Sequence, residues 1–174
     1  MADLEPEEQR KWEFLRDIPQ RDAIDAQLRS IAQSLSFVAG ASPWPQWCFG
    51  NLALGLVRDC VTYQLDNDRV GREQIDGYTD PYANPILPFT RGVDDCDAKA
   101  RLFVALCLAA GLHAEMVPRK SGTKLSHVYA RVFCRGPGET APRWYLAETI
   151  LRRARLGDVA EAVPKEIETG KWLF

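Results

Sequence analysis

Apolar residues recur at helical spacing in the N-terminal part of the chain. The pattern predicts helices over Leu4–Asp17, Arg21–Val38 and Pro45–Tyr63, with Pro19 separating the first two. The second of these helices carries an apolar stripe whose members are three or four positions apart: Ile24, Leu28, Ile31, Leu35 and Val38. A stripe of this kind is the face that a helix packs against a core.

The pattern changes twice in the middle of the chain. Asp66–Gly92 is rich in Asp, Gly, Asn and Pro, which predicts an irregular surface loop, and a loop of this length in a compact domain is more often functional than idle. A helix is then expected to start near Cys96, to be apolar nearly all round over Leu102–Ala110, and to stop at Gly111. We therefore expect this helix to lie buried in the middle of the fold.

Three short runs after this helix have the residue types and the flanking turns of β-strands. They are His113–Pro118, Val128–Cys134 and Trp144–Ile150, joined by the turn-forming sequences RKSGTKLS and RGPGETAPR. Helices followed by a small antiparallel sheet predict an α+β fold. The 174 residues, of which 46% are hydrophobic, suit one compact unit with a sizeable core.

Charge and apolar run length bear on location and on partners. The formal net charge is -2, so the chain has no basic surface for nucleic acid or for an anionic membrane. The N-terminus is acidic rather than signal-like, and the longest apolar run, Leu102–Ala110, is too short to span a bilayer. We expect a cytoplasmic protein with neither nucleic-acid nor membrane partners.

The cysteines argue against both disulfides and a zinc site. There are five of them, an odd number, and no two form a CxxC pair. They are Cys48, Cys60, Cys96, Cys107 and Cys134. We expect reduced thiols, no metal site and no other cofactor.

Cys96 has the sequence context of a nucleophile. Asp94 or Asp95 is a natural N-cap for the following helix, which places Cys96 in the first turn, where unpaired backbone N–H groups favour a negative sulfur. Three aspartates next to Cys96 act in the opposite direction, because nearby negative charge raises the pKa of a thiol. Catalysis therefore requires that these carboxylates cap the helix or face solvent, and that an imidazole assists the thiol.

His127 and Glu148 are the candidate partners of Cys96. Alternation along a strand puts His127, Tyr129, Arg131 and Phe133 on one face, and by the same rule Glu148 shares a face with Trp144 and Leu146 on the next strand. If these two strands pair, Glu148 can lie beside His127 and orient its ring. A thiol, an imidazole and an acid in this chain order predict acyl-transfer chemistry.

These motifs resemble those of the transglutaminase-like branch of the papain-like cysteine enzymes. That family has a Gly before an Asp-Cys pair at a helix start, an apolar helix ending in Ala-Gly, a strand opening with His, and a Trp followed by an acid. The matching positions are Gly92, Asp95, Cys96, Ala110, Gly111, His127, Val128, Trp144 and Glu148. The match covers Val57–Gly157, its lead-in sequences are similar to those of small stand-alone bacterial and phage members, and Glu148 stands where Asp is usual.

The resemblance implies a papain-like core, with a central helix packed on a small antiparallel sheet, plus N-terminal helices. We expect a helical extension over residues 1–45 and the transglutaminase-like domain over 46–174, packed together as one compact unit. The expected reaction is attack of Cys96 on an amide carbonyl, with His127 as base and then acid and Glu148 as orienter, through a thioester. Hydrolysis is favoured, as by a peptidase, amidase or deamidase acting on a protein or peptide.

Two alternatives and several supporting residues stay open. The chain could be a protein-crosslinking transglutaminase, or a non-catalytic structural or binding module of a phage or prophage particle. The candidates for the oxyanion hole or for substrate binding are Gln74, Tyr82, Asn84 and Asp95. The C-terminal Trp172-Leu173-Phe174 is a candidate docking segment, although packing on its own domain is the more common use of such a terminus.

Overall fold

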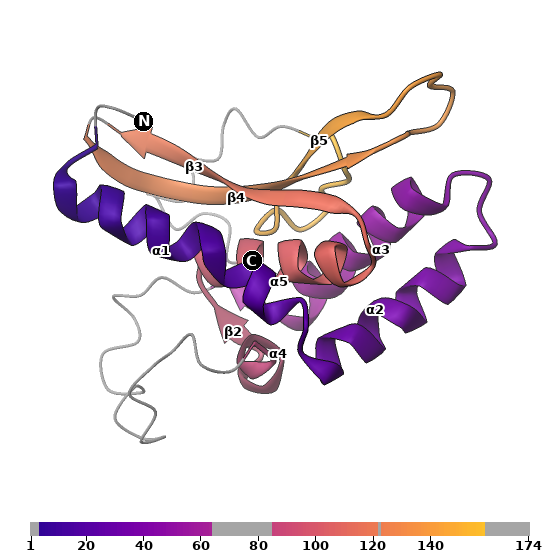
Figure 1. Ribbon diagram of the computed structural model, residues 1–174, viewed down its shortest axis with the longest axis horizontal. Helices are drawn as coiled ribbons and strands as arrows, with labels where there is room; N and C mark the ends of the chain where they lie inside the picture. The colour runs from indigo at the N-terminus through magenta and orange to yellow at the C-terminus, as the bar shows by residue number, and fades with distance from the viewer. Residues whose placement is uncertain (1–3, 64–84, 122, 159–174) are drawn as a thin grey trace.

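The computed structural model describes residues 4–63, 85–121 and 123–158. In this part of the chain, helices lie against one face of a three-stranded antiparallel sheet (Figure 1). The α+β class predicted from the sequence is therefore confirmed. In the same part of the chain, no helix is long and apolar enough to cross a membrane.

The first helices are α1 (Pro6–Asp22), α2 (Ala26–Ala39) and α3 (Pro45–Cys60). The predicted break at Pro19 is wrong, because α1 continues through this residue to its end. Pro19 lies in the last turn of α1 and is buried, so its missing N–H removes a single bond while its ring adds to the packing.

The break between α1 and α2 instead lies at Asp25. Its side chain accepts hydrogen bonds from the backbone N–H groups of Gln27 (2.9 Å) and Leu28 (3.0 Å), which is the N-cap arrangement. The cap fixes where α2 starts, so Ile24 precedes the helix.

The predicted apolar stripe of α2 is wrong at both ends. Ile24 is 75% exposed and Val38 is 57% exposed, whereas Leu28 is fully buried. The buried face runs instead through Leu28, Ala32 and Ala39, with Ile31 and Leu35 partly buried against the core. Two of these residues are alanines, whose small side chains let α2 approach its neighbours closely.

Helix α5 (Cys96–Ala109) is the centre of the fold, as predicted. Its side chains from Ala98 through Cys107 are buried, and it packs against α1, α2 and α3 as well as against the sheet. Gly111 follows with φ 77°, a left-handed conformation that ends the helix at the predicted residue.

A buried ion pair joins α1 to α5. The guanidinium of Arg101 donates to the carboxylate of Asp22, and each side chain is only 3% exposed. Trp12, Leu15 and Leu28, from α1 and α2, belong to the same core cluster as α5. The division into an extension over 1–45 and a domain over 46–174 stays a prediction.

The sheet consists of β3 (His113–Ser121), β4 (Lys124–Cys134) and β5 (Arg143–Ala147), in that order and all antiparallel. The first two strands are longer than predicted, and β5 ends three residues before the predicted Ile150. It ends early because the chain turns back, so that the N–H of Gly157 binds the carbonyl of Leu146 at 2.8 Å.

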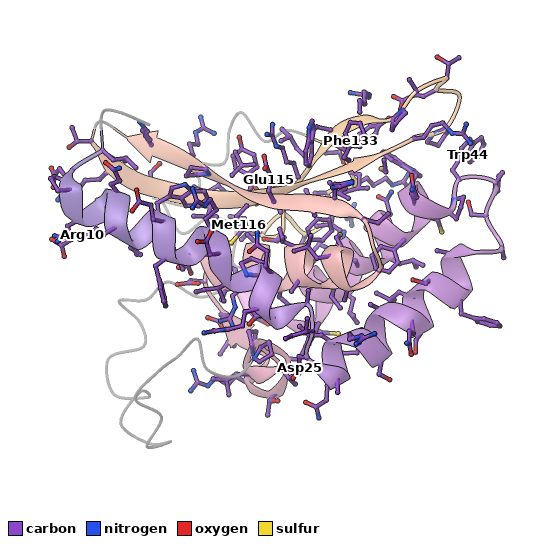
Figure 2. The ribbon with its side chains drawn as sticks, viewed as in Figure 1. Arg10, Asp25, Trp44, Glu115, Met116 and Phe133 are labelled. Carbon is purple, nitrogen blue, oxygen red and sulfur yellow. The ribbon has the colours of Figure 1, made fainter. Side chains whose placement is uncertain are left out.

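The two faces of the sheet differ in the way that the sequence predicts. Val128, Ala130, Val132 and Cys134 are buried on the helix side. Figure 2 shows Met116 of β3 directed toward the helices, while Glu115 and Phe133 lie on the other side of the sheet. Strand β4 therefore packs the face of Val128 and Val132 against α5 and presents the face of Phe133 on the other side, while His127, farther along the strand, is itself buried.

A parallel two-stranded ladder leads the chain into α5. Strands β1 (Thr62–Tyr63) and β2 (Val93–Asp94) pair with each other, so the end of α3 lies beside the residues that precede Cys96. Helix α4 (Leu87–Arg91) occupies the last part of the predicted loop Asp66–Gly92. Residues 66–84 of that loop lie outside the described part of the chain.

Candidate active site

Cys96 is the first residue of α5, and Asp95 caps this helix. A carboxylate oxygen of Asp95 accepts a hydrogen bond from the N–H of Ala98 at 3.1 Å. The sequence predicted an N-cap at Asp94 or Asp95, and the structure selects Asp95. The backbone N–H of Cys96 therefore lies in the first turn, where a helix supplies no carbonyl acceptor of its own.

The two other aspartates also turn toward the helix start. Asp94 accepts from the N–H of Asp95 at 3.0 Å, and Asp97 accepts from the N–H of Ala98 at 2.9 Å. Both side chains belong to buried residues. The carboxylates near Cys96 are thus held by backbone N–H groups rather than turned to solvent.

The Cys96 thiol lies against β4 at Val128, the residue after His127. The backbone N–H of Val128 forms a hydrogen bond with the sulfur. The last pair between β4 and β5 joins Ala130 to Ala147, so Val128 lies beyond the end of β5 and its N–H can reach the thiol. The sequence contains no signal for this contact, because it depends on where β5 ends.

His127 and Glu148 form the contact predicted for them. His127 Nε2 and a carboxylate oxygen of Glu148 are 2.9 Å apart, and both residues are buried. The other carboxylate oxygen of Glu148 accepts from the N–H of Ile150 at 3.3 Å. Glu148 follows β5 rather than lying within it, so the turn after Ala147 helps to fix its side chain.

A bulge in β4 lies directly beside His127. His127 pairs with Arg119, but the next pair joins Leu125 to Lys120, so Ser126 is an extra residue. The Ser126 hydroxyl donates to the carbonyl of Arg119 at 3.2 Å. Bulges of this kind change the direction of neighbouring side chains and are frequent beside active sites.

The environment of Cys96 opposes a free thiolate. Burial raises the pKa of the Cys96 thiol from its ordinary 9.0 to about 12, and the negative charges of Asp95, Asp97 and Glu148 add to this effect. The Val128 N–H lowers the pKa but does not compensate. Cys96 itself is partly buried and packs against the core cluster.

The arrangement suits a neutral thiol whose proton moves during the reaction. With Nε2 of His127 donating to Glu148, the other ring nitrogen, Nδ1, is free of its proton and can act as a base. The Glu148 carboxylate would then stabilise the imidazolium that forms.

Lys99 is a buried residue near the site that the sequence reasoning missed. It lies one helical turn after Cys96, and only 1% of its surface is exposed. Its ammonium donates to the carbonyl oxygens of Val57 and Val61 at the end of α3. One signal was present in the sequence, namely a lysine at the start of a helix whose other residues were expected to be buried.

Thr149, next to Glu148, is the second residue that was missed. It is fully buried, and its hydroxyl has no hydrogen-bond partner among the residues that the structure describes. A buried hydroxyl without a partner costs on the order of 1–3 kcal/mol.

We expect Thr149→Val to stabilise the protein by about 1 kcal/mol, because valine nearly keeps the shape and removes the hydroxyl. Thr149→Ser is the matched control, since it keeps the hydroxyl and loses a methyl group, and it should destabilise. Urea unfolding measures both variants. A less stable valine variant would mean that the hydroxyl is hydrogen-bonded in the folded protein.

Several predicted residues lie outside the described part of the chain. Gln74, Tyr82 and Asn84, the candidates for oxyanion or substrate binding, are among them, and so is the docking candidate Trp172-Leu173-Phe174. Asp95 is described, and its carboxylate caps α5; its part in substrate binding stays a prediction. Within residues 4–63, 85–121 and 123–158, no group of three His, Cys, Asp or Glu residues could hold a metal ion.

Cys96 thus lies at the start of α5, His127 on β4 and Glu148 just after β5; His127 contacts Glu148, and Cys96 lies against Val128, the residue after His127. Comparison of the chain with protein-family models, with curated proteins and with solved structures finds no match.

Proposed function

We propose that this chain is a cysteine-dependent acyl-transfer enzyme that acts on amide bonds of a protein or peptide. The observation that carries the proposal is the buried contact between His127 and Glu148. The Cys96 sulfur lies against the backbone N–H of Val128, the residue that follows His127 in β4. A buried imidazole–carboxylate pair beside a thiol at a helix start is the constellation that thioester chemistry needs.

The proposed reaction begins with the neutral thiol. Cys96 attacks the amide carbonyl carbon while its proton passes to Nδ1 of His127, and Glu148 stabilises the resulting imidazolium. The backbone N–H of Cys96 supports the charge that develops on the carbonyl oxygen. His127 then gives the proton to the leaving amine, the C–N bond breaks, and a thioester remains on Cys96.

The acyl acceptor decides the class of enzyme. Water, activated by His127, would release a carboxylic acid and restore the thiol, as in a peptidase, amidase or deamidase. A primary amine would instead form a new amide, as in a crosslinking transglutaminase. The resemblance to small stand-alone bacterial and phage proteins of the transglutaminase-like, papain-like group supports hydrolysis, and with it a cytoplasmic or virion-associated protein.

One observation favours a second candidate, a non-catalytic structural or binding module. The pKa of Cys96 is raised to about 12, the direction expected for a cysteine that only packs. In that case the His127–Glu148 pair would be a buried structural contact. The two candidates differ in one testable respect, which is the dependence of Cys96 reactivity on His127.

The reaction class can be tested with a peptide library and a fluorescent primary amine in the same incubation. New peptide N-termini would identify a peptidase, conversion of Gln to Glu a deamidase, and amine adducts a transglutaminase. Cys96→Ala is the control, and every product should disappear with it. Products that are the same for the parent and for Cys96→Ala would contradict the proposal.

A further inference from the structure

Lys99 is a buried cation that the proposed reaction does not use. Its ammonium is 3.4 Å from the carbonyl oxygen of Val57 and also binds that of Val61. Lysine is almost never fully buried without a compensating partner, so this position calls for a specific explanation.

The two carbonyls belong to the C-terminal end of α3. Val57 lies in its last turn and Val61 is its C-cap, where the helix presents partial negative charge. Strand β1 starts at the next residue, Thr62, and pairs with β2, which runs into the cap of α5. The ammonium therefore joins the end of α3 to the first turns of α5, one helical turn from Cys96.

The charged groups that act on Lys99 come from three neighbouring elements. Arg58 and Asp59 lie at the end of α3, Asp94 ends β2, and Glu148 follows β5. Burial lowers the pKa of Lys99 to about 8, the three carboxylates raise it, and Arg58 lowers it. Lys99 is therefore cationic below about pH 8 and loses its charge above it.

We propose that Lys99 is a positioning residue of this site, which holds the start of α5 against the end of α3 and offsets the charge of Glu148 at Cys96. The inference rests on the proposed function. Glu148 acts electrostatically both on Lys99 and on Cys96, which makes it the link between them. While Lys99 is charged, the negative sulfur that develops during the reaction costs less free energy to form.

The test compares the rate at which iodoacetamide labels Cys96 in the parent, in Lys99→Met and in Lys99→Arg. Methionine keeps the length and the packing of the stem, whereas arginine keeps the charge and the donors. Below about pH 7, we expect iodoacetamide to label Cys96 of Lys99→Met about tenfold more slowly than Cys96 of the parent. This is the effect of raising the pKa of the thiol by about one. Lys99→Arg should stay within about threefold of the parent.

The dependence on pH separates this role from a merely structural one. The ratio of parent to Lys99→Met rates should fall from about ten toward one as pH rises through about 8, because the parent lysine then loses its charge. A packing defect would give a ratio that does not change with pH. A constant ratio, or equal rates in the parent and Lys99→Met, overturns the proposal.

Asp59→Asn tests the same idea if the Lys99 variants do not fold. The Asp59 side chain is 64% exposed, and its charge raises the pKa of Lys99. Relative to the parent, iodoacetamide should label Cys96 of Asp59→Asn more slowly only between about pH 7 and 8, where Lys99 of the variant has lost its proton and that of the parent has not. A ratio that is flat over this range overturns the proposal.

The failure of this inference and that of the proposed function can be told apart. If His127→Ala slows the labelling of Cys96 but the Lys99 and Asp59 variants label at the rate of the parent, only the inference on Lys99 is contradicted. If labelling in the parent is independent of His127, the proposed function falls and the inference falls with it.

Discussion

Glu148→Gln should lower the rate of acyl transfer on the order of 10⁴-fold, the loss seen when the carboxylate of a Ser-His-Asp triad becomes an amide. The glutamine can donate its amide N–H to Nε2 of His127, which then acts as an acceptor. The ring proton would move to Nδ1, so the nitrogen that should take the proton of Cys96 would already carry one.

The size of glutamine makes this variant a sharp test. Its carbonyl oxygen can still accept the hydrogen bond from the N–H of Ile150, so the fold around residue 148 should persist, which thermal unfolding can confirm. Glu148→Asp is the matched variant, because it keeps the charge and shortens the side chain, and it should lose less activity. Activity of Glu148→Gln within a few-fold of the parent would show that Glu148 is only structural.

Arg101→Met should destabilise the protein by about 3–5 kcal/mol, because it leaves the buried carboxylate of Asp22 without its buried cation. Arg21, a second cation near Asp22, is 3.9 Å from it and 54% exposed, so it offers weak compensation. The pair also joins α1 to the central helix, and its loss should loosen that contact. The midpoint of urea unfolding measures the effect.

Two controls show whether the loss of stability comes from the burial of the Asp22–Arg101 pair or from breaking any ion pair. Arg16→Met breaks the exposed pair of Arg16 with Asp17 in the same helix and should have a much smaller effect than Arg101→Met. The double variant Asp22→Asn with Arg101→Met removes both buried charges and should recover most of the lost stability. A loss below about 1 kcal/mol for Arg101→Met would contradict the view that this pair anchors α1.

Local sequence signals were sufficient for the parts of the fold that local interactions decide. The cap at Asp94 or Asp95, of which the structure has Asp95, and the stop at Gly111 could be predicted because each acts on residues within one helical turn. Strand alternation and a short connection allowed the approach of His127 to Glu148 but did not fix it, because both residues lie beyond the last pair of β4 and β5.

The features that the sequence did not reveal depend on distant parts of the chain. Lys99 is buried because the end of α3 supplies its hydrogen-bond acceptors, and Arg101 is buried because α1 supplies Asp22. The spacing of apolar residues in a helix predicts neither partner. The break at Pro19 was mispredicted because the proline packs into the core instead of ending its helix. The raised pKa of Cys96 depends on how deeply the thiol is buried, which a sequence pattern does not measure.

The central claim is that His127 acts on Cys96, and the most direct test is the rate of Cys96 alkylation in the parent and in His127→Ala. The exposed thiol of Cys60 is an internal reference in the same molecule, and mass spectrometry separates the labelled sites. A thiol whose pKa is raised from 9.0 to about 12 and which has no base beside it should react roughly a thousandfold more slowly than an ordinary one at neutral pH.

The account predicts that at about pH 7 Cys96 of the parent reacts at least as fast as Cys60, and that His127→Ala slows it by about a hundredfold or more without changing Cys60. Parent Cys96 that reacts roughly a thousandfold more slowly than Cys60, at a rate that His127→Ala leaves unchanged, would contradict the account. That result would make Cys96 a packing residue of a non-catalytic module.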